Sequence, residues 1–188
     1  MPRSGDDARR RLHEAALELF RERGYDAVTT AEIAAKAGVT ERTFFRHFPD
    51  KREALFAQED ALRAGLEAGV MSAPENQGLM GVLLRAFRAV APMIEANRAL
   101  TEPLQKVIAQ TPALQERVLT KTAASTNTLA EALRGRGVEA GLAGLAAQVA
   151  MAAFSHAARA WFEDPAPGLD AHLIQAFDQL QALSLPPS

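Results

Sequence analysis

Cysteine is absent from the 188-residue sequence, which excludes disulfide bonds and thiolate metal sites. The sequence also lacks a glycine-rich phosphate loop and any nucleophile–base motif. We therefore predict that the protein is not an enzyme and has no cofactor. We expect no metal site, because the histidines do not pair with one another or with carboxylates at a ligand spacing. The four histidines are His13, His47, His156 and His172.

Aromatic residues make up only 6% of the sequence, and β-branched residues rarely alternate with polar ones, so signals for β-strands are nearly absent. Good helix formers dominate instead, interrupted by Pro and Gly. We predict an all-α fold of about nine helices. The first ends at Gly24, and the others run from Thr29 to Gly38, from Thr40 to Phe48, from Asp50 to Gly69, and over about 79–97, 103–109, 112–134, 138–162 and 169–184.

Long hydrophobic runs are also missing. No stretch approaches about 18 charge-free apolar residues, and the first twenty residues contain no uninterrupted apolar core of the signal-peptide type. The longest low-charge run, GLAGLAAQVAMAAFSHAARAWF, is rich in Ala and Gly and includes Gln148, His156 and Arg159. A buried or interface helix explains this run better than a membrane span does. We expect a cytoplasmic protein with no membrane partner.

The charge balance gives no overall sign of a nucleic-acid partner, because the formal net charge is −2. Residues 1–56 carry eleven basic and ten acidic residues, which is a weak asymmetry. If the chain binds DNA, its basic groups must gather on one face, because the summed charge does not attract a polyanion.

The spacing of residues 30–49 predicts a helix-turn-helix. Two helices that cross steeply need a small residue where they touch, and Ala34 lies four residues before Gly38. Glycine suits the tight turn because it adopts positive φ without strain. Phe44, six residues after the glycine, is a large apolar side chain that can fill the junction. These three residues occur in the order that the motif requires.

The second helix of this motif has one apolar side, where we expect Phe44 and Phe48 to be buried. Its other side chains then face outward, and a helix of this size fits the major groove of B-DNA. Thr30 and His47 are placed for contacts with the DNA backbone. We predict a DNA-binding surface made of Thr30, Thr40, Glu41, Arg42, Thr43, Phe45, Arg46, His47 and Lys51.

Four residues of this surface have specific expected roles. Arg42 and Arg46 lie one turn apart, and each could pair with O6 and N7 of a guanine. Thr43 could contact a thymine methyl group or a phosphate. Lys51, in the first turn of the next helix, could contact a phosphate. The alternative for each charged residue is an ordinary solvated helix surface.

The segment TTAEIAAKAGVTERTFFRHFPDKREAL resembles the DNA-binding signature of TetR-type (tetracycline-repressor-like) transcriptional regulators. The preceding FRERGYDAVTT extends the match to about residues 8–56. The resemblance implies a helix-turn-helix domain over 1–56, followed by a helical ligand-binding and dimerisation domain over 57–188. It also implies a homodimeric repressor that binds a palindromic double-stranded DNA operator and is released by a small, largely apolar effector.

The sequence departs from the usual pattern of that family at Phe45. The family commonly has tyrosine there, whose hydroxyl reaches a phosphate, and phenylalanine cannot donate that hydrogen bond. We expect the lost contact to cost about 0.5–1.5 kcal/mol of binding free energy. Glu41 is also unfavourable near phosphates, unless its carboxylate accepts a hydrogen bond from N4 of a cytosine.

Beyond residue 70 the sequence carries no diagnostic motif, and the sites there follow from the resemblance. Residues that could line an effector pocket, or simply form core, are Phe87, Met93, Leu104, Ile108, Asn127, Met151, Phe154, His156 and Trp161. The last two helices would pair with their symmetry mates in a dimer. The apolar residues expected at that interface are Leu142, Leu145, Val149, Leu173, Phe177 and Leu180.

A second hypothesis is a helical small-molecule carrier that has kept a helix-turn-helix as scaffold. Net acidity and Phe45 favour it, whereas the intact outer face of the second helix disfavours it. The role of Arg9, Arg10 and Arg11 is also open. They could follow the DNA backbone as an arm, or they could form the solvated start of the first helix.

Overall fold

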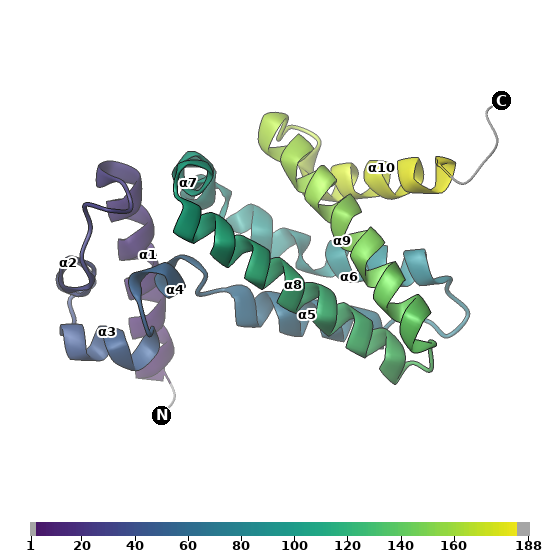
Figure 1. Cartoon of the computed structure of the whole chain (residues 1–188), viewed down its shortest axis with the longest axis horizontal. Helices are drawn as coiled ribbons and strands as arrows, with labels where there is room; N and C mark the ends of the chain where they lie inside the picture. The colour runs from purple at the N-terminus through teal and green to yellow at the C-terminus, as the bar shows by residue number, and fades with distance from the viewer. Residues whose placement is uncertain (1–2, 184–188) are drawn as a thin grey trace. The chain divides into compact units, whose positions relative to one another are not determined.

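The computed structural model of the chain describes the backbone of residues 3–183 and the side chains of residues 7–99 and 101–183. Ten α-helices and no β-strand occur in this part of the chain, which confirms the all-α prediction (Figure 1). The helices are α1 (Arg3–Arg23), α2 (Thr30–Lys36), α3 (Glu41–His47), α4 (Lys51–Leu55), α5 (Glu59–Met71), α6 (Leu79–Ala96), α7 (Arg98–Gln110), α8 (Pro112–Gly135), α9 (Ala140–Glu163) and α10 (Gly168–Ala182).

The single helix predicted from Asp50 to Gly69 is wrong, because the chain breaks it into α4 and α5. Phe56 leaves helical geometry, with φ −106° and ψ 27°. Phe56 and Ala57 pack against the core beneath α4, so tertiary packing outweighs the helix propensity of this segment. This break accounts for the tenth helix.

The described helices form two compact units. Unit 1 consists of the residues up to Asp60 together with Asn97–Leu119, and unit 2 consists of Ala61–Ala96 and the residues from Thr120 onward. The chain therefore passes from one unit to the other after residues 60, 96 and 119.

Unit 1 is built around α1, which packs against α2, α4 and α7, while α2 packs against α3. Its core is apolar and draws on every one of these helices. The largest contributors are Leu12, Leu17, Phe20, Ile33, Phe44, Phe48, Leu55, Leu104 and Leu114. The α1 helix ends as expected, because Gly24 takes a positive φ of 78° and donates its N–H to the carbonyl of Phe20.

The start of α2 is fixed by the capping box that the sequence predicts. Thr29 accepts from the backbone N–H of Glu32, and the Glu32 carboxylate accepts from the backbone N–H of Thr29. That backbone bond, together with Arg23 and the Thr29 hydroxyl, lowers the pKa of Glu32 to about 2. The charged carboxylate is thus present at the helix N-terminus at any ordinary pH.

Unit 2 has its own core, in which α10 packs against α9 and α6. The ring of Phe87 stacks on that of Phe154, with centroids 4.8 Å apart, and lies 6.2 Å from that of Phe177. Two side chains of α6 hold the start of α10. Arg88 donates to both carboxylate oxygens of Asp170, and Glu95 accepts the backbone N–H of Leu169 at 2.5 Å.

The α5 and α6 helices approach closely at Gly69. A Cβ atom at this position would lie 2.7 Å from the Cα atom of Ala86. We predict that Gly69→Ala lowers the free energy of unfolding by about 1 kcal/mol, because overpacking costs about 1–3 kcal/mol and helix propensity returns about 1. Urea denaturation measures this change. Glu67→Ala, exposed on the same helix, should stay within about 0.5 kcal/mol; equal values for the two variants would contradict the close approach.

One guanidinium closes the far end of α5. Arg136 donates from Nη1 to the carbonyls of Val70 and Ala73 (3.2 and 2.7 Å), and from Nη2 to that of Pro74 (2.9 Å). Val70 lies in the last turn of α5, where carbonyls lack intrahelical partners, and Ala73 and Pro74 lie in the loop after it. Arg136 therefore ties the α8–α9 turn to the end of α5 and to the α5–α6 loop.

Among the described residues, α9 is the one helix long and apolar enough to cross a membrane by length and composition. Of its most apolar 18-residue window, 39% is buried inside the protein. The buried side holds Ala143, Ala147, Ala150, Met151 and Trp161, whereas Leu142 and Leu145 are exposed on the other side. The helix is therefore apolar on two faces, one of which belongs to the core of unit 2.

Candidate nucleic-acid interface

The α2–α3 junction has the geometry that the sequence predicts. Gly38 adopts a φ of +68°, which residues with a Cβ rarely adopt. Val39, just after it, donates its N–H to the carbonyl of Ala34 at 2.9 Å. Ala34 is 1% exposed and Phe44 is fully buried, so the small residue, the glycine and the large apolar residue fill their predicted places.

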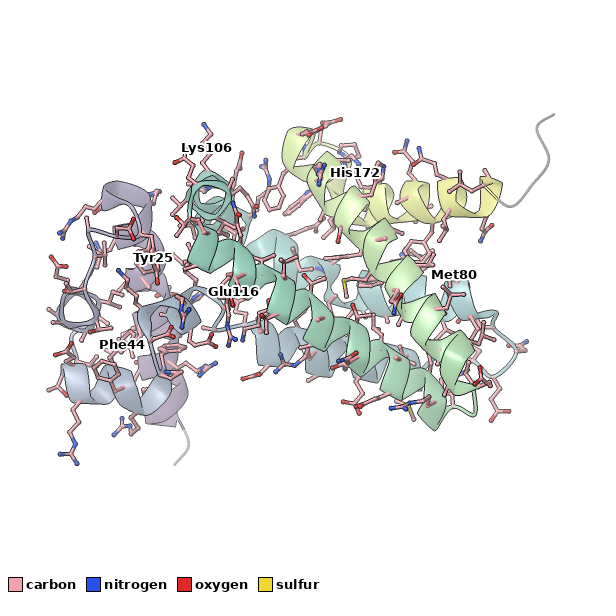
Figure 2. All side chains as sticks on the ribbon, viewed as in Figure 1. Tyr25, Phe44, Met80, Lys106, Glu116 and His172 are labelled. Atoms are coloured by element: carbon pink, nitrogen blue, oxygen red, sulfur yellow. The ribbon has the colours of Figure 1, made fainter. Side chains whose placement is uncertain are left out.

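The inner face of α3 is anchored by phenylalanine rings. Phe44, labelled in Figure 2, contacts Phe48 with ring centroids 5.7 Å apart. Both rings belong to the core of unit 1. Phe45 packs edge-on against Phe44 but is 53% exposed. The helix is thus fixed by one side, and an aromatic ring remains on the other.

The outer face of α3 carries two arginines, Arg42 and Arg46, which are both exposed. Neither makes a hydrogen bond or an ion pair with another described residue. In Figure 2, nitrogen-tipped side chains extend from α3 away from the rest of unit 1. These two cations are therefore available to a ligand outside the chain.

The threonines and Glu41 order the start of α3. Thr40 is its N-cap and accepts from the backbone N–H of Thr43, while the two hydroxyls lie 3.0 Å apart. Thr30 donates its hydroxyl to the Glu41 carboxylate at 2.5 Å, which joins α2 to α3. Glu41 is exposed on the outer face of α3, and its carboxylate also has a hydrogen-bond partner within the protein.

Lys51 is held more firmly than the sequence suggests. Its Nζ donates to the carbonyls of Tyr25 (2.9 Å) and Val28 (3.0 Å) and lies 4.2 Å from the centroid of the Tyr25 ring. An ammonium group has three donors, so one remains for a phosphate. Lys51 therefore joins the α1–α2 loop to the first turn of α4. His47, the last residue of α3, is half-buried.

Sequence reasoning missed the role of the α1 arginines. Arg9 donates to the carbonyl of His47, the last residue of α3. Arg11 donates to the carbonyl of Ala37, the C-cap residue of α2. Cations near helix C-termini are favourable because the terminal carbonyls are unpaired. Arg10 instead pairs with Asp7 and Glu14 on the surface of α1. The run of three arginines was the only available signal, and it does not say which carbonyls they reach.

His13 is a buried polar link between α1 and α4. Its Nδ1 lies 2.6 Å from the carbonyl oxygen of Ala54, and since a carbonyl only accepts, Nδ1 carries the proton. Burial lowers the pKa of His13 below its ordinary value of 6.5, and the bond to Ala54 only partly opposes this effect.

We predict that His13 makes unfolding easier in mild acid. The unfolded chain binds a proton on this imidazole near pH 6.5, whereas the folded chain takes it up only at lower pH, so stability falls as pH drops below about 6.5. Urea denaturation between about pH 7.5 and 5.5 measures the slope. The His13→Gln variant should lose less stability over this range; parallel slopes for the two proteins would refute the assignment.

The nine residues predicted to line an effector pocket, or simply to form core, divide between the two units. Those placed in the core of unit 2 are Phe87, Met93, Met151, Phe154 and Trp161. Leu104 and Ile108, on α7, pack in the core of unit 1, which is the core alternative that the sequence left open. Asn127 and His156 are exposed on helix surfaces, and their part in an effector pocket stays a prediction.

A cavity of about 580 Å³ lies along α6. It is bounded by the end of α5 and the start of α10. Its lining residues are Gly69, Ser72, Gln77, Gly81, Leu84, Arg85, Arg88, Ala89, Ala91, Pro92, Glu95 and Asp170. A volume of this size suits a small molecule.

The predicted dimer residues divide into two groups. Leu142 and Leu145 are 50% and 59% exposed, and Val149 and Leu180 are half-buried. Leu173 and Phe177 were assigned wrongly, because both are fully buried in the core of unit 2. Ile174, next to Leu173 on α10, is a large apolar residue that is 36% exposed. Helical spacing identified an apolar stripe but not the direction in which it faces.

Two family models match the chain. One, described as bacterial regulatory proteins of the tetR family, matches residues 12–58, and the other, described as the MftR C-terminal domain, matches residues 77–184. The first match contains α2, α3 and α4 entirely, which are the elements that build the candidate interface. The second covers more than half of the chain.

Proteins with similar sequences are named as transcriptional regulators. The HTH-type transcriptional activator FasR of Mycolicibacterium smegmatis is 30% identical over 174 residues, covering 86% of this chain and 75% of FasR. The HTH-type transcriptional regulator TcmR of Streptomyces glaucescens is 29% identical over 134 residues, or 68% of this chain. The matched segment spans 59% of the length of TcmR.

The fold has a counterpart among solved structures. Thermus thermophilus FadR, described as a TetR family transcriptional repressor in complex with lauroyl-CoA, superposes with a TM-score of 0.60 at 24% sequence identity. The superposition covers 96% of each chain. At this identity the likeness concerns the fold alone.

Proposed function

The chain belongs to the TetR family of transcriptional regulators, and from this premise we propose that it is a homodimeric repressor that binds a palindromic DNA operator and is released by a small-molecule effector. We also propose that it acts in the cytoplasm, where the operator would be reached.

One observation carries the proposal for DNA binding. The inner side of α3 is locked by the buried Phe44, while Arg42 and Arg46 on the outer side have no partner among the described residues. Recognition helices in this motif enter the major groove, where arginine pairs bidentately with guanine. Thr43 and Phe45 add a hydroxyl and an apolar ring for contacts with phosphate, sugar or thymine methyl groups.

The homodimer is supported by the second apolar face of α9. An exposed leucine is ordinary by itself, but Leu142 and Leu145 lie on one helix with the half-buried Val149, and α10 adds Ile174. A second copy of the same surface would cover this stripe in a two-fold dimer. Two recognition helices about 34–36 Å apart would then match successive major grooves and a palindromic site.

The effector is proposed to be a small molecule, by analogy with the lauroyl-CoA bound to Thermus thermophilus FadR. The cavity along α6 offers apolar wall from Leu84, Ala89 and Pro92 together with charged groups. An effector that binds the non-DNA-binding conformation more tightly lowers operator affinity, and operator DNA weakens effector binding by the same factor. FadR is described as a repressor and FasR as an activator, and we propose the repressor role.

Selection of bound duplexes from a random pool with the purified chain tests the function. We expect a palindromic winner whose affinity falls steeply with salt, with a slope of log K against log[salt] of about −0.9 per phosphate contacted. A carrier protein that kept the motif as scaffold would enrich no sequence at any salt concentration. Enrichment of a single half-site without symmetry would contradict the dimer while keeping DNA binding.

A further inference from the structure

Arg9 of α1 touches both ends of the DNA-binding segment. Its Nη1 donates to the carbonyl of His47 at 3.2 Å, and its Nη2 donates to the carbonyl of Ala57 at 3.1 Å. The guanidinium also lies over the Phe48 ring, 4.7 Å from its centroid, and 3.6 Å from a carboxylate oxygen of Asp60. One planar group therefore connects the last residue of the recognition helix to the break between α4 and α5.

The Ala57 carbonyl can accept this bond because the helix is interrupted there. Phe56 donates to Glu53 and Glu59 donates to Phe56, both over three residues, so the ordinary helical pattern stops at the break. A terminal carbonyl without an intrahelical partner needs another donor. Arg9 supplies that donor, and its position follows the position of the break.

Gln58 links the break between α4 and α5 to a second break, between α6 and α7. Gln58 and Asn97 exchange two hydrogen bonds through their amides, at 3.0 Å from Gln58 Nε2 to Asn97 Oδ1 and at 2.9 Å from Asn97 Nδ2 to Gln58 Oε1. Asn97 is the residue between α6 and α7, with φ −100° and ψ 2°. Both residues are only partly exposed.

These two breaks coincide with places where the chain changes unit. It leaves unit 1 after residue 60 and returns at residue 97, and the Gln58–Asn97 pair joins the two passages on the unit 1 side. Breaks of this kind absorb changes in φ and ψ more readily than helix interiors do. A change in backbone conformation where the chain crosses between the units is therefore expected to displace Gln58 or Asn97, which lie beside the two crossings.

We propose that Asn97, Gln58 and Arg9 form a relay. Through it, a displacement of the backbone at the two unit crossings changes the support of the C-terminal end of α3. The inference rests on the proposed function, because it assigns the regulation of the proposed DNA-binding surface. Displacement of Asn97 moves Gln58, the adjoining Ala57 carbonyl draws Arg9 with it, and Arg9 shifts the support of the His47 carbonyl. Arg9 is a positioning residue in this scheme and does not touch DNA.

The relay has a reciprocal consequence that needs no effector to be observed. Because coupling between two sites acts equally in both directions, operator DNA bound at α3 must alter the breaks. Amide hydrogen exchange of residues 56–60 and 97–101, with and without the selected duplex, reports this directly. In the natural chain we expect the duplex to slow exchange in both segments by about fivefold or more.

Two variants separate the links. Gln58→Met combined with Asn97→Leu replaces the amide pair by an apolar pair of similar size, and we expect duplex binding within about threefold of the natural chain, with the response lost in 97–101 but kept in 56–60. Arg9→Lys keeps the charge but loses the forked geometry, and we expect about tenfold weaker binding with no response in either segment. Arg10→Gln, on the exposed side of the same helix, is the matched control and should keep both responses.

The outcomes are distinguishable. A natural chain that binds no duplex sinks the proposed function and the relay together. Duplex binding without any change in residues 97–101, or an unchanged response in the Gln58→Met/Asn97→Leu protein, overturns the relay alone and leaves DNA binding standing. Equal thermal unfolding midpoints for the double variant and the natural chain exclude general loosening as the cause of a lost response.

Discussion

Phe44→Ala is expected to lower the free energy of unfolding of unit 1 by about 3–5 kcal/mol and to abolish specific DNA binding. The ring is fully buried and contacts the rings of Phe45 and Phe48, so truncation removes apolar burial and leaves a cavity between α2 and α3. A loss of this size is comparable to the whole stability of a small domain, which is about 5–15 kcal/mol. The outer arginines would then have no fixed orientation.

Urea denaturation followed by circular dichroism measures the stability change, and competition binding with the selected duplex measures affinity. Phe45→Ala is the matched control, because it removes the same ring from the adjacent, half-exposed position. It should cost less than about 1 kcal/mol of stability and weaken DNA binding only partly. A Phe44→Ala protein with natural stability would show that the ring does not anchor the helix.

Arg46→Ala is expected to weaken binding to the selected operator by about 1–3 kcal/mol, or about 5–150-fold, and to relax base preference at one position of each half-site. Arg46 is exposed and unpaired among the described residues, so its loss removes a base contact without unfolding the protein. Binding to a panel of duplexes, each changed at one base pair, measures both effects.

The control for charge is Arg134→Ala, which removes one exposed arginine of α8 in unit 2. It should leave the affinity and the base preference unchanged. If Arg46→Ala weakens all duplexes alike and makes the salt slope shallower by about one, Arg46 contacts a phosphate rather than a guanine. The same panel applied to Arg42→Ala would show which of the two arginines reads a base.

Local signals were sufficient for the helix-turn-helix. The Thr29–Glu32 capping box, the Gly38 turn and the burial of Phe44 depend on residues within a few positions of each other, where backbone preference and side-chain period act directly. The directions of Arg42 and Arg46 follow, since fixing one face of a short helix exposes the opposite one.

Contacts between distant segments could not be predicted in the same way. Arg9 reaches Ala57 across 48 residues, and Gln58 reaches Asn97 across 39. A polar side chain on a helix surface has many possible partners, and only the packing of the helices selects one. The break at Phe56 was missed for the same reason, because this partly buried residue packs against a core that the local sequence does not specify.

The apolar stripes of α9 and α10 show where sequence reasoning reached its limit. Helical period correctly marked Leu142 and Leu173 as members of apolar faces, but a period does not say whether a face meets the chain's own core or remains exposed. The sequence by itself determined the all-α class, the turn at Gly38 and the inward side of α3, because these depend on local geometry. The tertiary structure alone decided that Leu173 is buried, that Leu142 is exposed and that Arg9 joins α3 to the α4–α5 break, because those outcomes depend on which distant helices pack together.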